Sequence, residues 1–303
     1  MPSVPSTQSR KEIDYVLDFA ISLEEAERSP VTIKNYLCDL NYFVKWFELQ
    51  NSQKFSPEQI TPTDLRDYKH YLGEILSLKP KTINRKLSSL KTFLNWACTE
   101  ELIPDHRLPR IPKLVKEEKI GPQWLDKKEQ HSLVRIIEQG KNQRDITIIQ
   151  LLLNTGLRVS ELCNLHWNDL KITARKGCLV VRSGKGGKRR EIPLNKDARK
   201  ALKDLGYEAH QKTEKAIFIG QRGPMTPRGV ESMLHKYVVH TELDEVTPHR
   251  LRHTFCKNLI NAGVSLEKVA MLAGHENLET TRRYCSPSTH DLEAAVELIG
   301  VLQ

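Results

Sequence analysis

The chain has 303 residues, of which 28% are charged and 39% hydrophobic, a balance typical of folded globular proteins and not of disordered ones. No apolar run approaches the roughly 20 residues that span a bilayer, and the N-terminus lacks the apolar core of a signal peptide. We therefore expect a cytoplasmic protein with no membrane partner. The six scattered cysteines form no C-x-x-C pair, so we interpret them as reduced packing residues and expect neither a zinc site nor a disulfide framework.

The length predicts two domains, and the net charge of +9 is unevenly spread between them. Residues 1–119 hold 18 Lys/Arg against 17 Asp/Glu, a net charge of +1. The remaining residues hold 29 Lys/Arg against 21 Asp/Glu, a net charge of +8. A basic excess of this kind is typical of proteins that bind nucleic acid, although it can also serve solubility alone.

The first hundred residues carry apolar side chains at helical spacing, interrupted by proline. One helix is expected at about 11–27, and three more begin at Ser29-Pro30, Thr61-Pro62 and Lys79-Pro80, where proline can occupy the first helical position. The pattern predicts a four-helix domain over residues 1–103. Residues 104–123 are rich in proline and charge, which indicates a linker with few contacts, followed by a second domain over 124–303.

The fourth helix begins with the sequence KPKTINRKLSSLK, which contains no acidic residue. Short hydrogen-bonding side chains alternate there with basic ones, and this mixture suits contacts with DNA phosphates and grooves. A solvated helix face is the plainer alternative. The predicted DNA-contacting residues in this helix are Lys79, Lys81, Thr82, Asn84, Arg85, Lys86 and Lys91.

The second domain is expected to begin with a helix capped by Asp126. A buried helix then ends at Thr155-Gly156, because glycine terminates helices in the left-handed conformation. Arg158 follows at once, and Ser160 is expected to cap a short helix that contains Glu161.

Two β-like runs come next, at residues 179–182 and 190–194, with the Gly-rich turn SGKGG between them. They predict a hairpin whose tip carries Lys185. Helices are expected at about 195–205 and 227–240. A further helical region starts at Thr247-Pro248, and an amphipathic helix over about 292–302 ends the chain.

The stretch from His249 to Tyr284 gathers the residues with the clearest chemistry. It contains a His-x-x-Arg pair, His249 and Arg252, then a Gly-His step at His275, and it ends on the tyrosine. A tyrosine hydroxyl is a poor nucleophile at neutral pH because its ordinary pKa is about 10. Basic groups beside it suggest a site where a phenol attacks something anionic.

The segments TGLRVSELCNL, PHRLRHTF and AGHENLETTRRY occur in this order, with the lysine hairpin between the first two. Together they resemble the tyrosine recombinase (phage integrase) family, most closely its bacterial two-domain Xer-like members and those of integrons or transposons. The resemblance implies a mainly α-helical protein with a small β-sheet. Its parts would be a four-helix SAM-like core-binding domain and an α+β catalytic domain that together form a C-shaped DNA clamp.

The resemblance also implies a role for each residue. Arg158 and Arg252 would hold the scissile phosphate, His249 and His275 would donate to its oxygens or help to remove the tyrosine proton, and Tyr284 would attack. Lys185 would protonate the departing 5′-oxygen, with Lys188 as a rival. His253 is interpreted as structural or as a support behind the catalytic residues, Glu161 as a support, and Lys188, Arg189 and Arg190 as contacts to the DNA backbone. Such chemistry needs no metal and no cofactor, because the covalent intermediate retains the bond energy.

The expected function is site-specific recombination through a 3′-phosphotyrosyl intermediate, whether in integration, excision or resolution. The resemblance implies specific double-stranded sites and a homotetramer on the bacterial nucleoid. In that assembly the C-terminal helix would dock into a neighbouring protomer, unless it packs on its own domain. Partner recombinases and accessory proteins stay unspecified. Two alternatives remain open: a nicking-closing enzyme like type IB topoisomerases, and a non-catalytic DNA-binding regulator.

Overall fold

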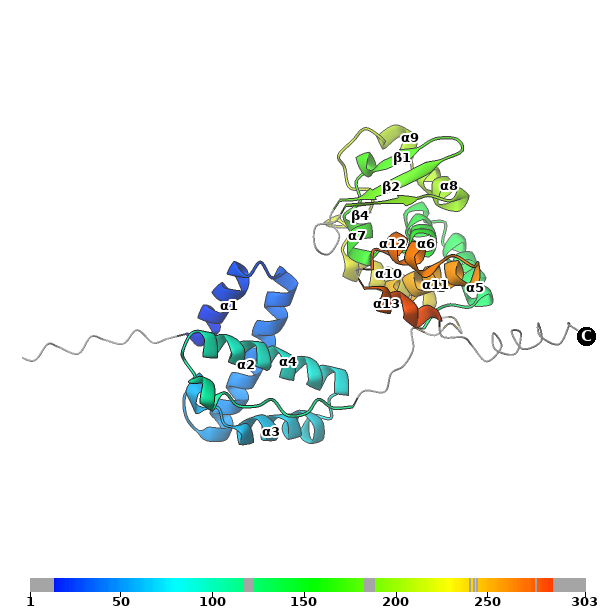
Figure 1. Cartoon of the computed structure of the whole chain (residues 1–303). Coiled ribbons are helices and arrows are strands. Elements are labelled where there is room, and N and C mark those ends of the chain that lie inside the picture. The colour runs from blue at the N-terminus through cyan, green and yellow to red at the C-terminus, as the bar shows by residue number, and fades with distance from the viewer. Residues whose placement is uncertain are drawn as a thin grey trace, which may run out of the picture. The chain divides into compact units, whose positions relative to one another are not determined.

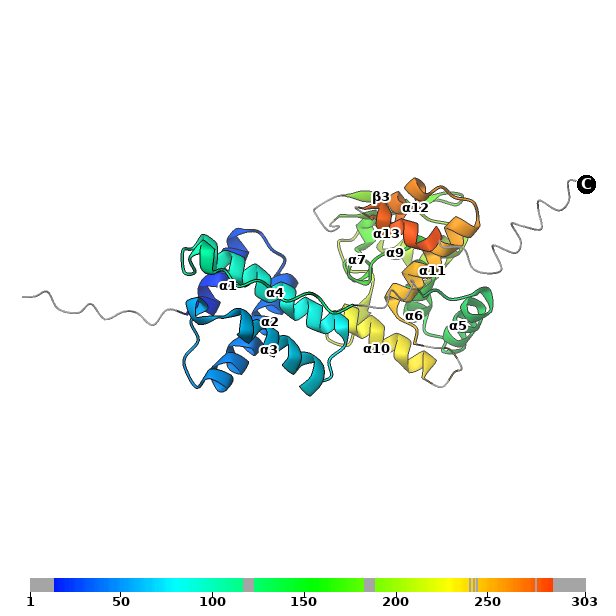
Figure 2. The ribbon, with the colours of Figure 1, turned by 60° about the horizontal axis from the view of Figure 1, so that its bottom comes forward.

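The computed structural model describes residues 14–116, 123–182, 189–239, 241, 243, 245–275 and 277–285. The chain separates into two compact units, residues 1–119 and 120–303. The described part of the first is helical, and the second combines helices with small antiparallel sheets (Figures 1 and 2). The expectation of a mainly helical protein with a small sheet is confirmed. Among the described residues, no helix is both long enough and apolar enough to cross a membrane.

The helices of the N-terminal unit begin where proline and a capping side chain coincide. Ser29 Oγ accepts a hydrogen bond from the Thr32 amide, and Thr61 forms a reciprocal capping box with Asp64. Lys79 precedes Pro80 without such a side-chain cap. The helices are α1 (Tyr15–Glu25), α2 (Pro30–Asn51), α3 (Pro62–His70), which continues into a π-turn (Tyr71–Ile75), and α4 (Pro80–Thr99).

Aromatic rings fill the core between these helices. Phe43 of α2 packs edge-on against Tyr68 of α3, with ring centroids 4.9 Å apart, and Phe19 of α1 packs against Phe93 of α4 at 5.4 Å. These four side chains are almost fully buried. Edge-to-face ring pairs add about 0.5–1.5 kcal/mol each to the stability that apolar burial provides. The N-terminal unit therefore has a hydrophobic core of its own.

The segment expected to be a contact-poor linker is in part packed onto the N-terminal unit. Ile111 and Val115 lie against its core. The Asn84 side chain donates to the carbonyl of Val115 at 2.9 Å and accepts from its amide at 2.8 Å, while Lys69 Nζ donates to the Lys113 carbonyl at 2.6 Å. The side-chain amide of Asn84 thus anchors this segment to the N-terminal unit. Proline content signalled an extended segment but not what it packs against.

The described C-terminal unit is built around α6 (Gln143–Thr155), whose Ile148, Leu151 and Leu152 are fully buried. It packs against α5, α8 and α11. Asp126 caps α5 as expected, and Thr247 caps α11. The other helices are α5 (Lys127–Gln139), α7 (Val159–Cys163), α8 (Lys196–Asp204), α9 (Tyr207–His210), α10 (Pro227–Val238), α11 (Pro248–Asn261), α12 (Leu266–Ala273) and α13 (Leu278–Arg282).

A three-stranded antiparallel sheet, in the order β1-β2-β3, lies beside these helices (Figure 1). Its register pairs Leu170 with Leu179, and Val181 with Arg190. The two expected hairpin strands are confirmed as β2 (Gly177–Val181) and β3 (Arg190–Pro193). The sequence patterns did not predict β1 (Leu170–Ile172), which has only three residues, or the short pair β4 (Ile219–Gly220) and β5 (Gly223–Pro224).

Gly156 ends α6 in the left-handed conformation, with φ of 62°, as the sequence predicted. A β-carbon at this position would lie 2.3 Å and 2.6 Å from the Phe255 ring of α11. The residue is therefore constrained twice, by its backbone conformation and by the close approach of α11. This turn places Arg158 beside the helix that carries Arg252.

Gly156→Ala is expected to lower the free energy of unfolding of the C-terminal unit by about 2–4 kcal/mol, because left-handed strain adds to overlap with Phe255. Gly263→Ala is the matched control. Gly263 is also left-handed, with φ of 78°, but has open space at the β-carbon position. Its substitution should cost only about 1 kcal/mol. Urea titrations of both variants measure the difference, and equal losses would contradict the packing argument.

Candidate active site

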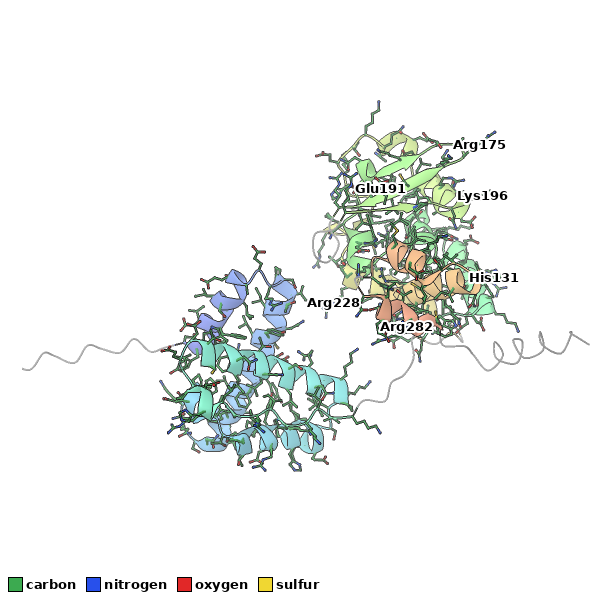
Figure 3. The ribbon with its side chains drawn as sticks, in the orientation of Figure 1. His131, Arg175, Glu191, Lys196, Arg228 and Arg282 are labelled. Atoms are coloured by element: carbon green, nitrogen blue, oxygen red, sulfur yellow. The ribbon has the colours of Figure 1, made fainter. Side chains whose placement is uncertain are left out.

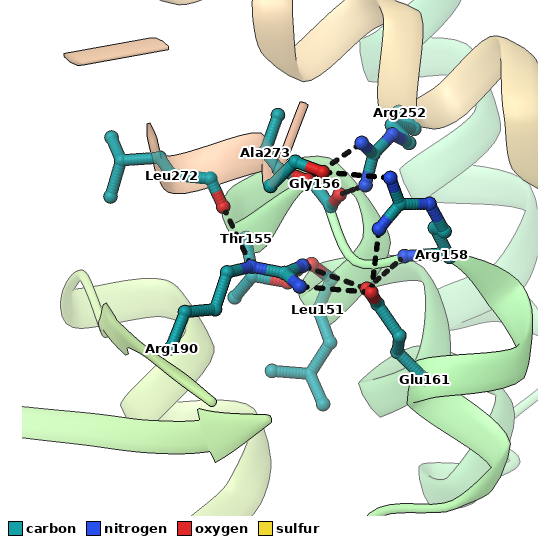
Figure 4. Close-up of polar contacts among 10 residues, drawn as sticks. Leu151, Thr155, Gly156, Arg158, Glu161, Arg190, Arg252, Leu272 and Ala273 are labelled. Atoms are coloured by element: carbon teal, nitrogen blue, oxygen red, sulfur yellow. Dashed lines mark hydrogen bonds and ion pairs between the residues drawn. The ribbon is translucent and has the colours of Figure 1, made fainter. Parts of the chain in front are cut away.

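Glu161 joins two of the predicted site segments through its buried carboxylate. The carboxylate accepts hydrogen bonds from the Arg158 main-chain amide and from Arg158 Nη1, both at 2.8 Å. It also accepts two bonds from Arg190, at 2.9 Å and 2.7 Å (Figure 4). Burial opposes ionisation of Glu161, but the bonds from Arg190 and Arg158 outweigh it and lower the pKa of the carboxyl.

Arg158, and not Ser160, is the N-cap residue of α7, which corrects the expected cap. The Glu161 side chain at the third helical position reaches back to the Arg158 amide, the second half of a capping box. The local signal was present, because a glutamate three residues after a helix start is typical of this arrangement. The carboxylate that caps the helix is therefore also the one that pairs with the arginine side chains.

Arg252 of α11 lies beside Arg158 with its side chain directed inward. The residue is 3% exposed, and it donates to the carbonyls of Gly156 at 2.5 Å and Ala273 at 2.6 Å. Arg158 Nη2 donates to the next carbonyl, that of Gly274, at 2.7 Å. Burial and the charge of Arg158 lower the pKa of Arg252 to about 10, so it stays charged at neutral pH. Two neighbouring cations held in this way favour the binding of an anion.

Tyr284 packs against α11, with its hydroxyl at a histidine of that helix. His253 Nδ1 and Tyr284 Oη share a hydrogen bond. The ring of His249 lies edge-on to that of His253, with centroids 4.0 Å apart. The ring of His275 stacks parallel to that of Tyr284 at 6.3 Å, and its Nδ1 bonds Thr281 Oγ1 at 2.7 Å. The structure therefore brings together the two predicted histidines and the tyrosine.

His253 is a functional candidate that the sequence interpretation assigned a structural or supporting role. Its ring contacts the hydroxyl of the predicted nucleophile. A signal was available, because His253 follows His249 by four residues and lies on the same face of α11. Burial and the charges of His249 and Arg252 lower its pKa to about 4. The ring is therefore neutral at pH 7 and can accept a proton.

Tyr284 itself is 1% exposed, packed with Phe255, Cys256 and Val269. Burial raises the pKa of its phenol above the ordinary value and the Cys256 thiol adds to this, while Arg252 partly offsets both. Lys257 Nζ lies 3.5 Å from the Tyr284 carbonyl and 4.9 Å from the centroid of the Trp124 ring. In this conformation the phenol is protonated at neutral pH and shielded from solvent.

The remaining predicted residues have different surroundings. Lys185 and Lys188 lie outside the described residues. Arg189 is exposed and pairs with Glu191 at 3.7 Å, whereas the Arg190 side chain is only 13% exposed and points at Glu161. The donors of Arg190 are thus directed at protein oxygens in this structure, whereas the sequence predicted a contact with the DNA backbone. Figure 3 shows other charged side chains of this unit, among them Arg175, Lys196 and Arg228, that extend outward from the ribbon.

On α4, Lys79, Lys81 and Lys91 are exposed, and Thr82 is half-buried. Arg85 and Lys86 both pair with the buried carboxylate of Asp39, and Lys86 also lies over the Tyr42 ring at 4.1 Å. The Arg85 side chain is nonetheless about half exposed, at 48%.

Two of the six free cysteines, Cys163 and Cys256, are buried, fewer than the sequence interpretation implied. Among the described residues, no cluster of three or more His, Cys, Asp or Glu could hold a metal ion.

The buried histidines should make the C-terminal unit sensitive to acid. Burial, followed by neighbouring positive charges, lowers the pKa of His253 and of His275 to about 4 from an ordinary 6.5. The unfolded chain therefore binds these protons at a higher pH than the folded chain. Stability should be greatest above about pH 6.5 and fall as the pH drops towards about 4.

We expect a loss on the order of 1–2 kcal/mol in unfolding free energy between pH 7 and pH 4.5, after allowance for solvent screening. Urea titrations at a series of pH values measure it. The double variant His253→Asn/His275→Asn should have a flatter pH dependence, while the variant His131→Asn, at an exposed position, should keep the wild-type slope. An unchanged slope in the double variant would refute the assignment.

Comparisons with known proteins show to which family the chain belongs. Residues 123–290 match the phage integrase family, and residues 17–101 match the N-terminal SAM-like domain of phage integrases. The TnP I resolvase of Bacillus thuringiensis is 29% identical over 294 residues, covering 95% of this chain and 100% of the relative. Tyrosine recombinase XerC of Staphylococcus aureus (strain JH9) is 34% identical over 294 residues, covering 92% of this chain and 94% of the relative.

The fold has a counterpart among solved structures. The Tn1549 transposon integrase, solved in complex with circular intermediate DNA, superposes with a TM-score of 0.71 at 22% identity, covering 93% of this chain and 98% of that one. The resemblance inferred from the three sequence segments is thereby confirmed. The family match covers more than half of the chain and includes every residue of the candidate site, so this protein is a member of the phage integrase family of tyrosine recombinases.

Proposed function

We propose that this protein is a site-specific DNA recombinase in which Tyr284 cleaves one strand and forms a 3′-phosphotyrosyl linkage. The observation that carries the proposal is the arrangement on α11. Arg252 lies beside Arg158, and the next residue, His253, forms a hydrogen bond with the hydroxyl of Tyr284. A cationic site for a phosphate and a nucleophile are thus joined by two consecutive residues. Cleavage and rejoining of DNA, as in integration, excision or resolution, require both.

In the proposed reaction, Arg158 and Arg252 bind the non-bridging oxygens and stabilise the charge that builds up on them. His249 and His275 donate further hydrogen bonds to these oxygens. The Tyr284 oxygen forms a bond to phosphorus, its proton passes to the neutral ring of His253, and the bond from phosphorus to the 5′-oxygen breaks. That oxygen takes a proton from Lys185, or from Lys188. Rejoining is the reverse, with a 5′-hydroxyl as the nucleophile.

Because Tyr284 is 1% exposed, its hydroxyl can reach a phosphate only after a local rearrangement. An incoming phosphate supplies a reason for one. Its negative charge offsets the repulsion between Arg158 and Arg252, and it also raises the pKa of the nearby histidines, which makes His253 a better proton acceptor. Binding of DNA and activation of the nucleophile are therefore linked by electrostatics.

The N-terminal unit is proposed to hold the duplex through α4. The exposed Lys79, Lys81 and Lys91, with Thr82 and the exposed part of Arg85, carry this proposal, whereas Asn84 and Lys86 are engaged within the protein. Binding through phosphates should weaken steeply with salt. A substrate of this kind implies action in the bacterial cytoplasm, on the nucleoid or on a mobile element.

A covalent adduct tests the function directly. On a nicked suicide duplex that carries the target site, found by footprinting on genomic or element-end DNA, the wild type should accumulate a protein–DNA adduct. Tyr284→Phe should form none, because it lacks the attacking oxygen. His253→Phe should slow adduct formation about 10²–10⁴-fold, the usual contribution of a proton acceptor.

Tyr237→Phe is the matched control, because its hydroxyl bonds Asp145 in another part of the unit and the variant should react normally. An adduct with Tyr284→Phe would refute the assignment of the nucleophile. Absence of any adduct with the wild type would favour a non-catalytic DNA-binding protein. Relaxation of any supercoiled plasmid by a monomer, with no preferred site, would favour a topoisomerase-like enzyme.

Strand exchange between two sites is proposed to involve four copies of the chain. Apolar residues at helical spacing between positions 292 and 302 support a C-terminal helix that docks into a neighbouring protomer. Deletion of residues 288–303 should leave the affinity for a single site within about threefold, a change of under about 1 kcal/mol, and should abolish recombination between two sites. Gel-shift and recombination assays measure the two effects. Normal recombination by the shortened chain would rule out the docking helix.

A further inference from the structure

Arg190 is the first residue of β3, but its side chain belongs to the site. It donates two hydrogen bonds to Glu161, at 2.9 Å and 2.7 Å, and its Nε donates to the carbonyl of Leu272 at 3.3 Å (Figure 4). The guanidinium also covers Gly274. A β-carbon on Gly274 would lie 2.8 Å from Cζ and Nη1 of Arg190. Arg190 therefore contacts both the helix that begins at Arg158 and the turn that precedes His275.

The end of α12 explains why three arginines meet here. The last carbonyls of a helix have no partner within the helix. Those of Ala270 and Met271 accept main-chain bonds from the turn that follows α12. The next three carbonyls each accept from an arginine: Leu272 from Arg190, Ala273 from Arg252 and Gly274 from Arg158. Three consecutive main-chain oxygens thus fix the relative positions of three guanidinium groups.

The charges of this cluster are linked through Glu161. The three arginines and one carboxylate together carry a net charge of +2, and the carboxylate is shared by Arg158 and Arg190. Without Arg190, Glu161 would form its ion pair with Arg158 alone, whose Nη1 already donates to it at 2.8 Å. The carboxylate would then neutralise more of the Arg158 charge, and Arg158 would attract a phosphate less strongly.

We propose that Arg190 is a positioning residue for the cleavage reaction: it offsets the charge of Glu161 and holds the Leu272–Gly274 turn, so that Arg158 remains available to the scissile phosphate. The inference rests on the proposed function and deepens it. Arg190 acts through Glu161 and not by contact with DNA, since its donors are directed at protein oxygens and its side chain is 13% exposed.

A second substitution in the same cluster should restore part of the rate that the first one loses. Arg190→Gln should slow single-turnover adduct formation about 10- to 100-fold, less than the about 10²–10³-fold loss that follows removal of a donor in direct contact with the reacting group. The double variant Arg190→Gln/Glu161→Gln should be faster than Arg190→Gln by about threefold or more, because the uncompensated carboxylate is gone. Arg190→Lys, which keeps the charge, should lie between Arg190→Gln and the wild type.

Three further measurements separate positioning from folding and from the chemistry of the leaving group. Thermal melting shows whether each variant is folded, and Arg190→Lys serves if Arg190→Gln is not. A substrate with sulfur in place of the bridging 5′-oxygen needs no acid to release its leaving group, and on it the Arg190→Gln defect should persist. Arg199→Gln is the matched control, because Arg199 also donates to a main-chain carbonyl, that of Leu194, but lies away from the site.

A double variant no faster than Arg190→Gln would overturn the charge-offset role, as would a defect that disappears on the sulfur substrate. Normal rates for Arg190→Gln would overturn it as well. The wild type distinguishes this failure from failure of the proposed function. If the wild type forms the Tyr284 adduct and the double variant is not rescued, only the inference about Arg190 fails; if the wild type forms no adduct, both fail.

Discussion

The site depends on one buried carboxylate surrounded by guanidinium groups. Glu161 accepts from the amide and side chain of Arg158 and from the side chain of Arg190, and its ionised form is favoured although it is buried. A buried charge is tolerated only when it is paired and fully hydrogen-bonded. These bonds hold the start of α7, the start of β3 and the turn after α12 together. Segments far apart in the sequence therefore meet at one point.

The groups around Tyr284 differ in their protonation at neutral pH. Burial, followed by neighbouring positive charges, lowers the pKa of His253 and of His275 and keeps both rings neutral at pH 7. Arg252 stays charged, with two of its donors on the carbonyls of Gly156 and Ala273. Before substrate arrives, the site thus has cations suited to a phosphate and a neutral base at the tyrosine hydroxyl. The cations favour the binding of an anion, and the neutral base can accept the proton of the hydroxyl that attacks it.

Local sequence signals predicted most of the helices and the two hairpin strands, and the structure brings several of the predicted site residues together. Pairs of Ser or Thr with proline marked the starts of α2, α3 and α11, and Gly156 marked the end of α6, because capping and backbone conformation depend on nearest neighbours. Short strands such as β1 were missed because three residues are too few to show an alternating pattern. The family resemblance supplied the roles of Arg158, Arg252 and Tyr284, which periodicity alone could not.

The contacts that the sequence did not predict join partners distant in the chain. Arg190 pairs with a residue 29 positions earlier, and Asn84 bonds one 31 positions later. A basic or amide side chain next to a predicted DNA-contacting segment resembles a DNA contact until its partner is known. His253 was underestimated for a related reason: its value lies in contact with Tyr284, 31 residues away, and not in its own neighbourhood.

If Tyr284 cleaves DNA as proposed, its burial also affects how the protein treats DNA that is not its target. Conformations with an exposed phenol are minor states, and the rate of cleavage is proportional to the fraction of molecules that occupy them. A short encounter with arbitrary DNA does not repay the loss of the packing against Phe255 and of the bond to His253. Only a duplex that binds through many contacts shifts the population enough. The packing around Tyr284 would thus suppress cleavage of DNA that binds weakly, although this packing does not itself contact the bases.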